Sequence, residues 1–156
     1  MISPLPSSVP GPHRKFLHSA VERLQRDERL LGVAAGGSFL TNSMDEFSDL
    51  DLVIATEAAH HRQVLADRQQ IASSLGPLLT AFTGEHVGEP RLLICLYAVE
   101  PPLHVDLKFV ALPDLARRVE DPAILWERDG LNQIRHRRAE SSKGFEHFLA
   151  LGRDGP

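Results

Sequence analysis

Two short segments, residues 49–54 and 103–110, begin with alternating polar and apolar side chains, and this alternation is the strongest constraint on the fold. Successive side chains of a β-strand point to opposite faces, so each segment is expected to bury one row of apolar side chains. The opposite rows are polar, with Asp49 and Asp51 in the first segment and His104, Asp106 and Lys108 in the second. The pattern predicts a sheet with one buried face and one face rich in carboxylates.

Apolar patterns elsewhere predict helices and further strands around these two segments. Helices are expected from residue 13 to residue 30 or 31, over 58–75, and from 113 to 120. Further strands are expected over residues 31–35, 78–82, 91–98 and 124–126. This mixture predicts an α/β (α+β) protein, in which helices flank a small mixed β-sheet.

The length of 156 residues favours a single domain. Residues 1–12 are rich in proline and are expected to form an extended lead-in, which leaves residues 13–150 for the domain. The net charge of −4 argues against nonspecific nucleic-acid binding through the whole surface. The single cysteine, Cys95, excludes an internal disulfide and any site built from several cysteines.

The sequence offers no element for membrane insertion. No apolar stretch reaches the roughly 20 residues that a membrane-spanning helix needs, and the N-terminus lacks the apolar region of a signal peptide. We therefore expect a cytoplasmic protein without a membrane partner.

A glycine-rich turn, Gly36-Gly37-Ser38, follows the strand expected at 31–35. Glycine allows the backbone to turn sharply and to approach a ligand closely. Successive backbone N–H groups in such a turn, or at the start of a helix near Ser38, can bind phosphate oxygens. On its own, the same tripeptide is more often a simple turn.

The carboxylates Asp49, Asp51 and Asp106 converge if the two alternating segments are neighbouring strands. Two negative charges about 4 Å apart repel by on the order of 4 kcal/mol at an effective dielectric constant near 20. A divalent cation, which takes oxygen ligands, removes this penalty. The alternative for an isolated Asp-x-Asp is an acidic strand face in contact with water.

Together these features resemble the DNA polymerase beta superfamily of nucleotidyltransferases, in its minimal and antibiotic-modifying branches. The resemblance rests on Gly37-Ser38, on the run Ser48-Asp49-Leu50-Asp51-Leu52-Val53, and on His104-Val105-Asp106-Leu107. It covers residues 13–126 and implies that residues 13–150 form a single nucleotidyltransferase domain of the polymerase beta type.

The resemblance implies a metal-dependent enzyme that transfers a nucleoside monophosphate to a hydroxyl group and releases pyrophosphate. Asp49, Asp51 and Asp106 would bind one or two Mg²⁺ ions, and Asp106 would also act on the attacking hydroxyl. Gly37 and Ser38 would contact the β- and γ-phosphates of ATP or another nucleoside triphosphate.

Three further residues are candidates for the site. Lys108 shares a strand face with Asp106 and is a candidate triphosphate contact, or else a lysine in solvent. Ser48 is expected either to hydrogen-bond at the site or to end the preceding loop. His104 is expected to bond a carboxylate or to contact the substrate.

The acceptor is expected to be a small hydroxylated molecule that receives AMP. The alternatives are a protein or tRNA acceptor, or an inactive nucleotide-binding module with a regulatory role. The loop 39–47 lacks the arginine and glycine common in antibiotic-modifying relatives. The C-terminal helical domain of larger relatives is also expected to be absent. A second copy or a protein partner would then complete the acceptor site, or the site would stay incomplete.

Overall fold

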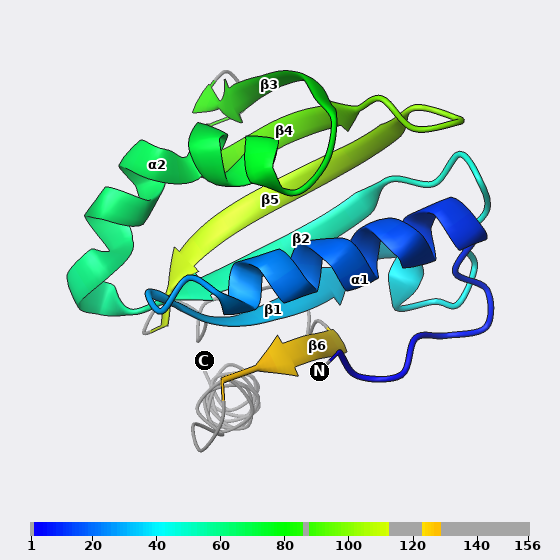
Figure 1. Cartoon of the computed structure of the whole chain (residues 1–156), viewed down its shortest axis with the longest axis horizontal. Coiled ribbons are helices and arrows are strands. Elements are labelled where there is room, and N and C mark those ends of the chain that lie inside the picture. Colours follow the sequence, from blue (N-terminus) through cyan, green and yellow to red (C-terminus); the bar gives the residue numbers. More distant parts are fainter. Residues whose placement is uncertain (1, 86–87, 113–122, 129–156) are drawn as a thin grey trace, which may run out of the picture.

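The computed structural model describes residues 2–85, 88–112 and 123–128 (Figure 1). These residues form two α-helices and one six-stranded mixed sheet, which confirms the expected α+β class. The short helix expected over 113–120 and the last part of the expected domain, residues 129–150, lie outside the described residues.

Helix α1 (Gly11–Gln25) begins two residues before the expected start, because proline is tolerated in a first helical turn. It ends at Gln25, earlier than expected, because Leu30 is needed as a buried strand residue. Helix α2 (His61–Ser74) follows a short 3-10 turn at Ala58–His60. No helix in the described ranges combines the length and apolar character required to cross a membrane.

The first residues of the chain pack against the domain. Val9 is buried, and Ile2 and Leu5 contact the hydrophobic core. The N–H group of Ser3 donates a hydrogen bond to the carbonyl oxygen of Leu125 at 2.7 Å. Of the lead-in expected at residues 1–12, the described part from residue 2 is therefore held against the domain, and α1 includes its last two residues.

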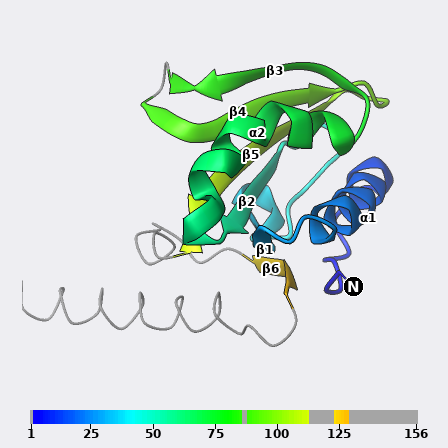
Figure 2. The ribbon, with the colours of Figure 1, turned by 60° about the vertical axis from the view of Figure 1, so that its left-hand side comes forward.

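The sheet places the two alternating segments next to each other at its centre. Its strands run in the order β3-β4-β5-β2-β1-β6, with β3 and β6 at the edges (Figures 1 and 2). β2 and β5 are parallel, and the other neighbouring pairs are antiparallel. The strands are β1 (Leu30–Gly36), β2 (Leu50–Thr56), β3 (Leu78–Gly84), β4 (Glu89–Tyr97), β5 (Leu103–Ala111) and β6 (Ala123–Glu127).

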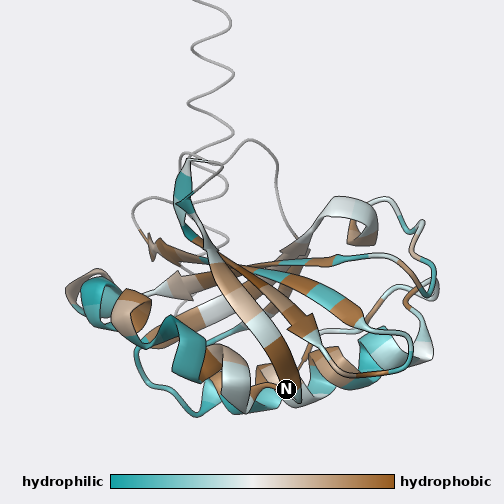
Figure 3. Cartoon of the chain, turned by 90° about the horizontal axis from the view of Figure 1, so that it is seen from above, coloured by the Kyte–Doolittle hydropathy of each residue, from teal (hydrophilic) through white to brown (hydrophobic). Residues whose placement is uncertain are grey.

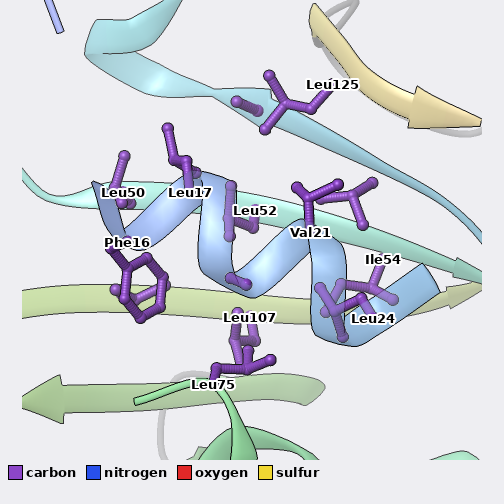
Figure 4. Packing of buried hydrophobic residues seen from close by; sticks show 14 of the residues in the cluster. Phe16, Leu17, Val21, Leu24, Leu50, Leu52, Ile54, Leu75, Leu107 and Leu125 are labelled. Carbon is purple, nitrogen blue, oxygen red and sulfur yellow. The ribbon is translucent and has the colours of Figure 1, made fainter. Parts of the chain in front are cut away.

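The hydrophobic core lies between one face of this sheet and the two helices (Figure 3). Helix α1 packs its apolar row onto the leucine and isoleucine side chains of β2 and β5 (Figure 4). Leu50 and Leu52 of β2 and Leu107 of β5 are almost fully buried, as the alternation predicts. Because alternate residues face opposite sides, this burial holds the polar row on the face away from the helices.

Candidate active site

Asp51 and Asp106 are direct partners in the parallel pairing of β2 with β5. Both side chains project from the face opposite the helices, because their neighbours Leu50, Leu52 and Leu107 are buried on the helix side. The two carboxyl groups are close enough to share a hydrogen bond. The expected convergence of the alternating strands is therefore present in the fold.

The third aspartate, Asp49, is linked to Asp106 by the side chain of His104. Asp49 lies one residue before β2, so it is not a strand residue as the alternation had suggested. The His104 side chain lies with Nε2 2.9 Å from Oδ1 of Asp106 and Nδ1 3.5 Å from Oδ2 of Asp49. The expectation that His104 bonds a carboxylate is confirmed, and its ring lies between two of the three aspartates.

The pKa of Asp51 is raised above its ordinary value of 3.8. Burial is the largest cause, followed by the negative charge of Asp106, the hydrogen bond between the two carboxyl groups, and the charge of Asp49; His104 opposes the rise. Ionised Asp51 is thus held in an environment that disfavours its charge. A nearby cation would relieve this cost.

Gly37 directs the backbone past the Asp51 carboxylate. Its φ of 63° lies in the left-handed region, which glycine adopts without steric cost. A Cβ atom at this position would overlap Oδ2 of Asp51. The residue starts a three-residue 3-10 turn, Gly37–Phe39, which includes Ser38. Only glycine satisfies both constraints, so the turn and the carboxylate form one compact unit.

Ser48 ends the loop that precedes Asp49. Its Oγ accepts a hydrogen bond from the N–H of Asp45 at 2.9 Å, and its own N–H donates to the Asp45 carbonyl at 3.1 Å. The serine side chain is therefore part of a turn over residues 45–48. This arrangement fits the second of the two roles expected for Ser48.

Lys108 forms an ion pair with Glu89 on β4, with Nζ 3.3 Å from Oε2. The same carboxylate accepts a hydrogen bond from Arg91, which is the main reason that the pKa of Glu89 is lowered to about 2. Since β4 and β1 lie on opposite sides of the β5–β2 pair, Lys108 is directed away from Gly37. A contact between Lys108 and a triphosphate at Gly37 requires this ion pair to open.

An apolar strip continues the site toward the β3 edge. Ile94 of β4 is the direct partner of Asp106, and Phe82 of β3 is the partner of Ile94. Leu92 and Leu96 flank Ile94 on the same strand face, because Leu93 and Cys95 are buried against the helices. Phe82 is 48% exposed. The surface beside Asp106 therefore suits the apolar part of a ligand.

Sequence reasoning missed one residue next to the site, His13 of α1. Its Nε2 lies 2.7 Å from the carbonyl oxygen of Ser48, and the side chain is buried. The sequence feature that could have identified His13 is its position in the apolar row of α1, where a histidine interrupts aliphatic and aromatic residues.

The three carboxyl groups of the site have the chemistry of a divalent-metal site. Carboxylate oxygens are the ligands that Mg²⁺ prefers, and two of the three carboxyl groups already lie together. Within residues 2–85, 88–112 and 123–128, however, no group of three or more histidine, cysteine or acidic side chains is arranged as a preformed metal site. The chemistry fits, but His104 contacts one oxygen each of Asp49 and Asp106, so an ion that used these two oxygens would compete with the ring.

Comparison with known families adds one finding. A family model described as a nucleotidyltransferase domain matches residues 17–125, from within α1 to within β6. The match includes Gly37, Asp49, Asp51 and Asp106. No curated protein matches the chain.

Proposed function

The chain belongs to the nucleotidyltransferase domain family, and we propose that it transfers AMP from ATP to a hydroxyl group of a small molecule. The observation that carries this proposal is the in-register pairing of Asp51 with Asp106 beside the Gly37 turn. We expect the reaction to take place in the cytoplasm, where ATP is available as the donor.

The triphosphate is proposed to lie on the β1 side of Asp51. Gly37 has no side chain to block this approach, and its neighbour Ser38 is only partly buried. The backbone N–H groups of this turn would donate hydrogen bonds to the β- and γ-phosphates. Such contacts would hold the α-phosphorus in line between the acceptor oxygen and the leaving pyrophosphate.

Asp49, Asp51 and Asp106 are the proposed ligands of one or two Mg²⁺ ions. A bound divalent cation would neutralise the carboxylates and polarise the phosphate oxygens. The raised pKa of Asp51 supports this assignment, because burial and the neighbouring carboxylates outweigh the favourable charge of His104. His104 would then leave its position between Asp49 and Asp106 and retain one of these contacts.

Asp106 is proposed to accept the proton of the acceptor hydroxyl. The hydroxyl oxygen forms a bond to the α-phosphorus while the bond to the bridging oxygen of pyrophosphate breaks. Asp106 lies at the border between the Asp51 carboxylate and the apolar strip, so it can reach both reactants. A carboxylate is basic enough for this role when the hydroxyl has already been acidified.

The acceptor is proposed to rest on the apolar strip formed by Phe82, Leu92, Ile94 and Leu96. This strip begins at Ile94, the direct neighbour of Asp106, and lies on the side opposite Gly37. A small molecule with an apolar face would bury that face here and direct a hydroxyl group toward Asp106. The small-molecule acceptor is preferred for this reason over a protein or tRNA.

The experiment is to measure pyrophosphate release from ATP and Mg²⁺ with a panel of hydroxylated small molecules, including aminoglycosides and lincosamides. We expect acceptor-dependent release that Asp106→Asn lowers by at least about 100-fold. Glu46→Gln is the matched control, since it removes an exposed carboxylate close to Asp49 in sequence.

Labelled ATP incubated with cell lysate separates the alternatives. Transfer of label to one protein or RNA band, without turnover of any small molecule, would instead identify a macromolecular acceptor. ATP binding that is unaffected by Asp106→Asn, with no turnover by the wild type, would identify an inactive nucleotide-binding module.

A further inference from the structure

His13 is the polar exception in the buried row of α1. The residue is 2% exposed, and the other buried residues of this helix are Phe16, Leu17, Ala20, Val21 and Leu24. Nδ1 of His13 is buried without a hydrogen-bond partner in the described part of the chain. Burying an unpaired polar atom costs stability, so packing alone does not favour histidine at this position.

The other ring nitrogen of His13 connects α1 to the loop before the carboxylates. Nε2 lies 2.7 Å from the carbonyl oxygen of Ser48. A carbonyl oxygen can only accept, so Nε2 carries the proton and donates it. Ser48 is also fixed on its other side by its hydrogen bonds with Asp45. Ser48 is therefore held from two sides, and the bond from His13 is the one that reaches the peptide group joining Ser48 to Asp49.

The hydrogen bond from His13 reaches the chain at Ser48, two residues before β2 begins. β2 begins at Leu50, which is the first residue paired with β5. Asp49 precedes this ladder, and its side chain is 54% exposed. The direction of the Asp49 carboxylate therefore depends on its contact with His104 and on the backbone at Ser48, which His13 restrains.

We propose that His13 is a positioning residue that sets the orientation of Asp49 through the carbonyl group of Ser48. The catalytic part of this inference rests on the proposed nucleotidyl transfer; the anchoring part does not. The imidazole touches no reacting atom, and it acts by keeping the first carboxylate of Asp-x-Asp aligned with Asp51. A misalignment on the order of 1 Å can lower turnover about 100-fold.

The test compares three substitutions of His13. In His13→Gln, the side-chain amide nitrogen can reach the position of Nε2 and donate to Ser48. In His13→Asn, a similarly polar amide ends near the position of Nδ1 and cannot reach the carbonyl. His13→Leu removes the donor and keeps the bulk. The glutamine and asparagine variants form the matched pair, and they decide the question even when the leucine variant does not fold.

Two readouts are measured on each folded variant: ATP turnover, and hydrogen–deuterium exchange of the amides of residues 44–50. We expect His13→Gln to keep kcat within about threefold of the wild type. His13→Asn and His13→Leu should lower kcat about tenfold or more, with the KM for ATP changed less than about threefold. Amide exchange at residues 48–50 should be faster in these two variants.

Wild-type kcat and exchange in His13→Asn would overturn the proposal, as would equal losses in the glutamine and asparagine variants. Absence of turnover in the wild type would contradict the proposed nucleotidyl transfer, but not the anchoring role of His13. In that case, the exchange comparison still decides whether His13 anchors the Ser48–Asp49 peptide.

Discussion

Gly37 passes Asp51 so closely that a methyl group on its α-carbon would overlap Oδ2 of the aspartate. The turn after β1 and the carboxylate of β2 therefore cannot be placed independently. Gly36, the residue before the turn, is also the direct partner of Asp51 in the β1–β2 ladder. Phosphate groups bound by this turn would lie beside the carboxylates, which is the arrangement that nucleotidyl transfer needs.

Gly37→Ala is expected to lower kcat/KM for ATP by at least about 100-fold, because the new methyl group displaces Asp51 or the turn. The positive φ adds a stability cost of about 1–2 kcal/mol. Gly88→Ala is the matched control, since Gly88 also has a positive φ but nothing within 4 Å of an added Cβ. The comparison needs steady-state kinetics and urea unfolding of both variants. Equal activity of the two variants would contradict the proposed role of Gly37.

Asp51→Asn is expected to stabilise the metal-free protein at neutral pH while abolishing activity. The pKa of Asp51 is raised in the fold, so the unfolded carboxyl group ionises first as the pH increases from 3.8. The free energy of unfolding of the wild type therefore falls until the pH passes the raised pKa, and it then stays level. The asparagine variant does not lose stability in this way, and the difference is small because solvent screens the partly exposed group.

The measurement is urea unfolding of wild type and Asp51→Asn in EDTA at several pH values from 4 to 7. The stability difference in favour of the variant should grow with pH. A difference that is independent of pH, or that favours the wild type at pH 7, would mean that Asp51 carries no unfavourable charge in the fold.

Mg²⁺ is expected to stabilise the wild type and to leave Asp51→Asn almost unchanged. A cation at 100 times its dissociation constant adds about 2.7 kcal/mol to the free energy of unfolding. For a protein of this size, that corresponds to an increase in Tm of about 5–10 °C. Differential scanning calorimetry with Mg²⁺, with EDTA, and with NaCl at matched ionic strength tests this. The same shift with NaCl would indicate general screening of charge rather than a metal site.

Lys108→Met is expected to raise the KM for ATP about threefold or more, because it removes an ammonium group that can pair with phosphate oxygens. Loss of the Lys108–Glu89 ion pair should change the free energy of unfolding by less than about 1 kcal/mol, as for most partly exposed ion pairs. Arg91→Met is the control, since it removes the other cation bound to Glu89. Unchanged KM values in Lys108→Met would show that Lys108 stays with Glu89 during the reaction.

Much of the fold follows from periodicity. The alternation in residues 103–109 correctly predicts which of these residues are buried, because a strand inverts side-chain direction at every residue. Val110 departs from it, since it shares the face of Asp106 but is buried in a second cluster with Ala55 and Leu112. Helix ends are predicted less well. The apolar pattern of α1 runs on into Leu30, and the helix stops at Gln25 because burial in β1 outweighs helical preference there.

The site is predictable in its residue types but not in its contacts. Alternation gives the face on which Asp51 and Asp106 lie, but it does not specify that their strands are parallel neighbours. The bridge from His104 to Asp49 and the ion pair of Lys108 with Glu89 depend on strand register, which a single sequence does not encode locally. Asp49 lies just outside β2, because pairing with β5 begins at Leu50.

The most direct test is a crystal structure of the protein with Mg²⁺ and an ATP analogue that cannot be cleaved between the α- and β-phosphates. We predict a metal ion coordinated by Asp51 and Asp106, with the triphosphate against the backbone of Gly37 and Ser38. A nucleotide bound elsewhere, or one bound at Gly37 while Asp51 and Asp106 remain paired to each other without a cation, would contradict the account.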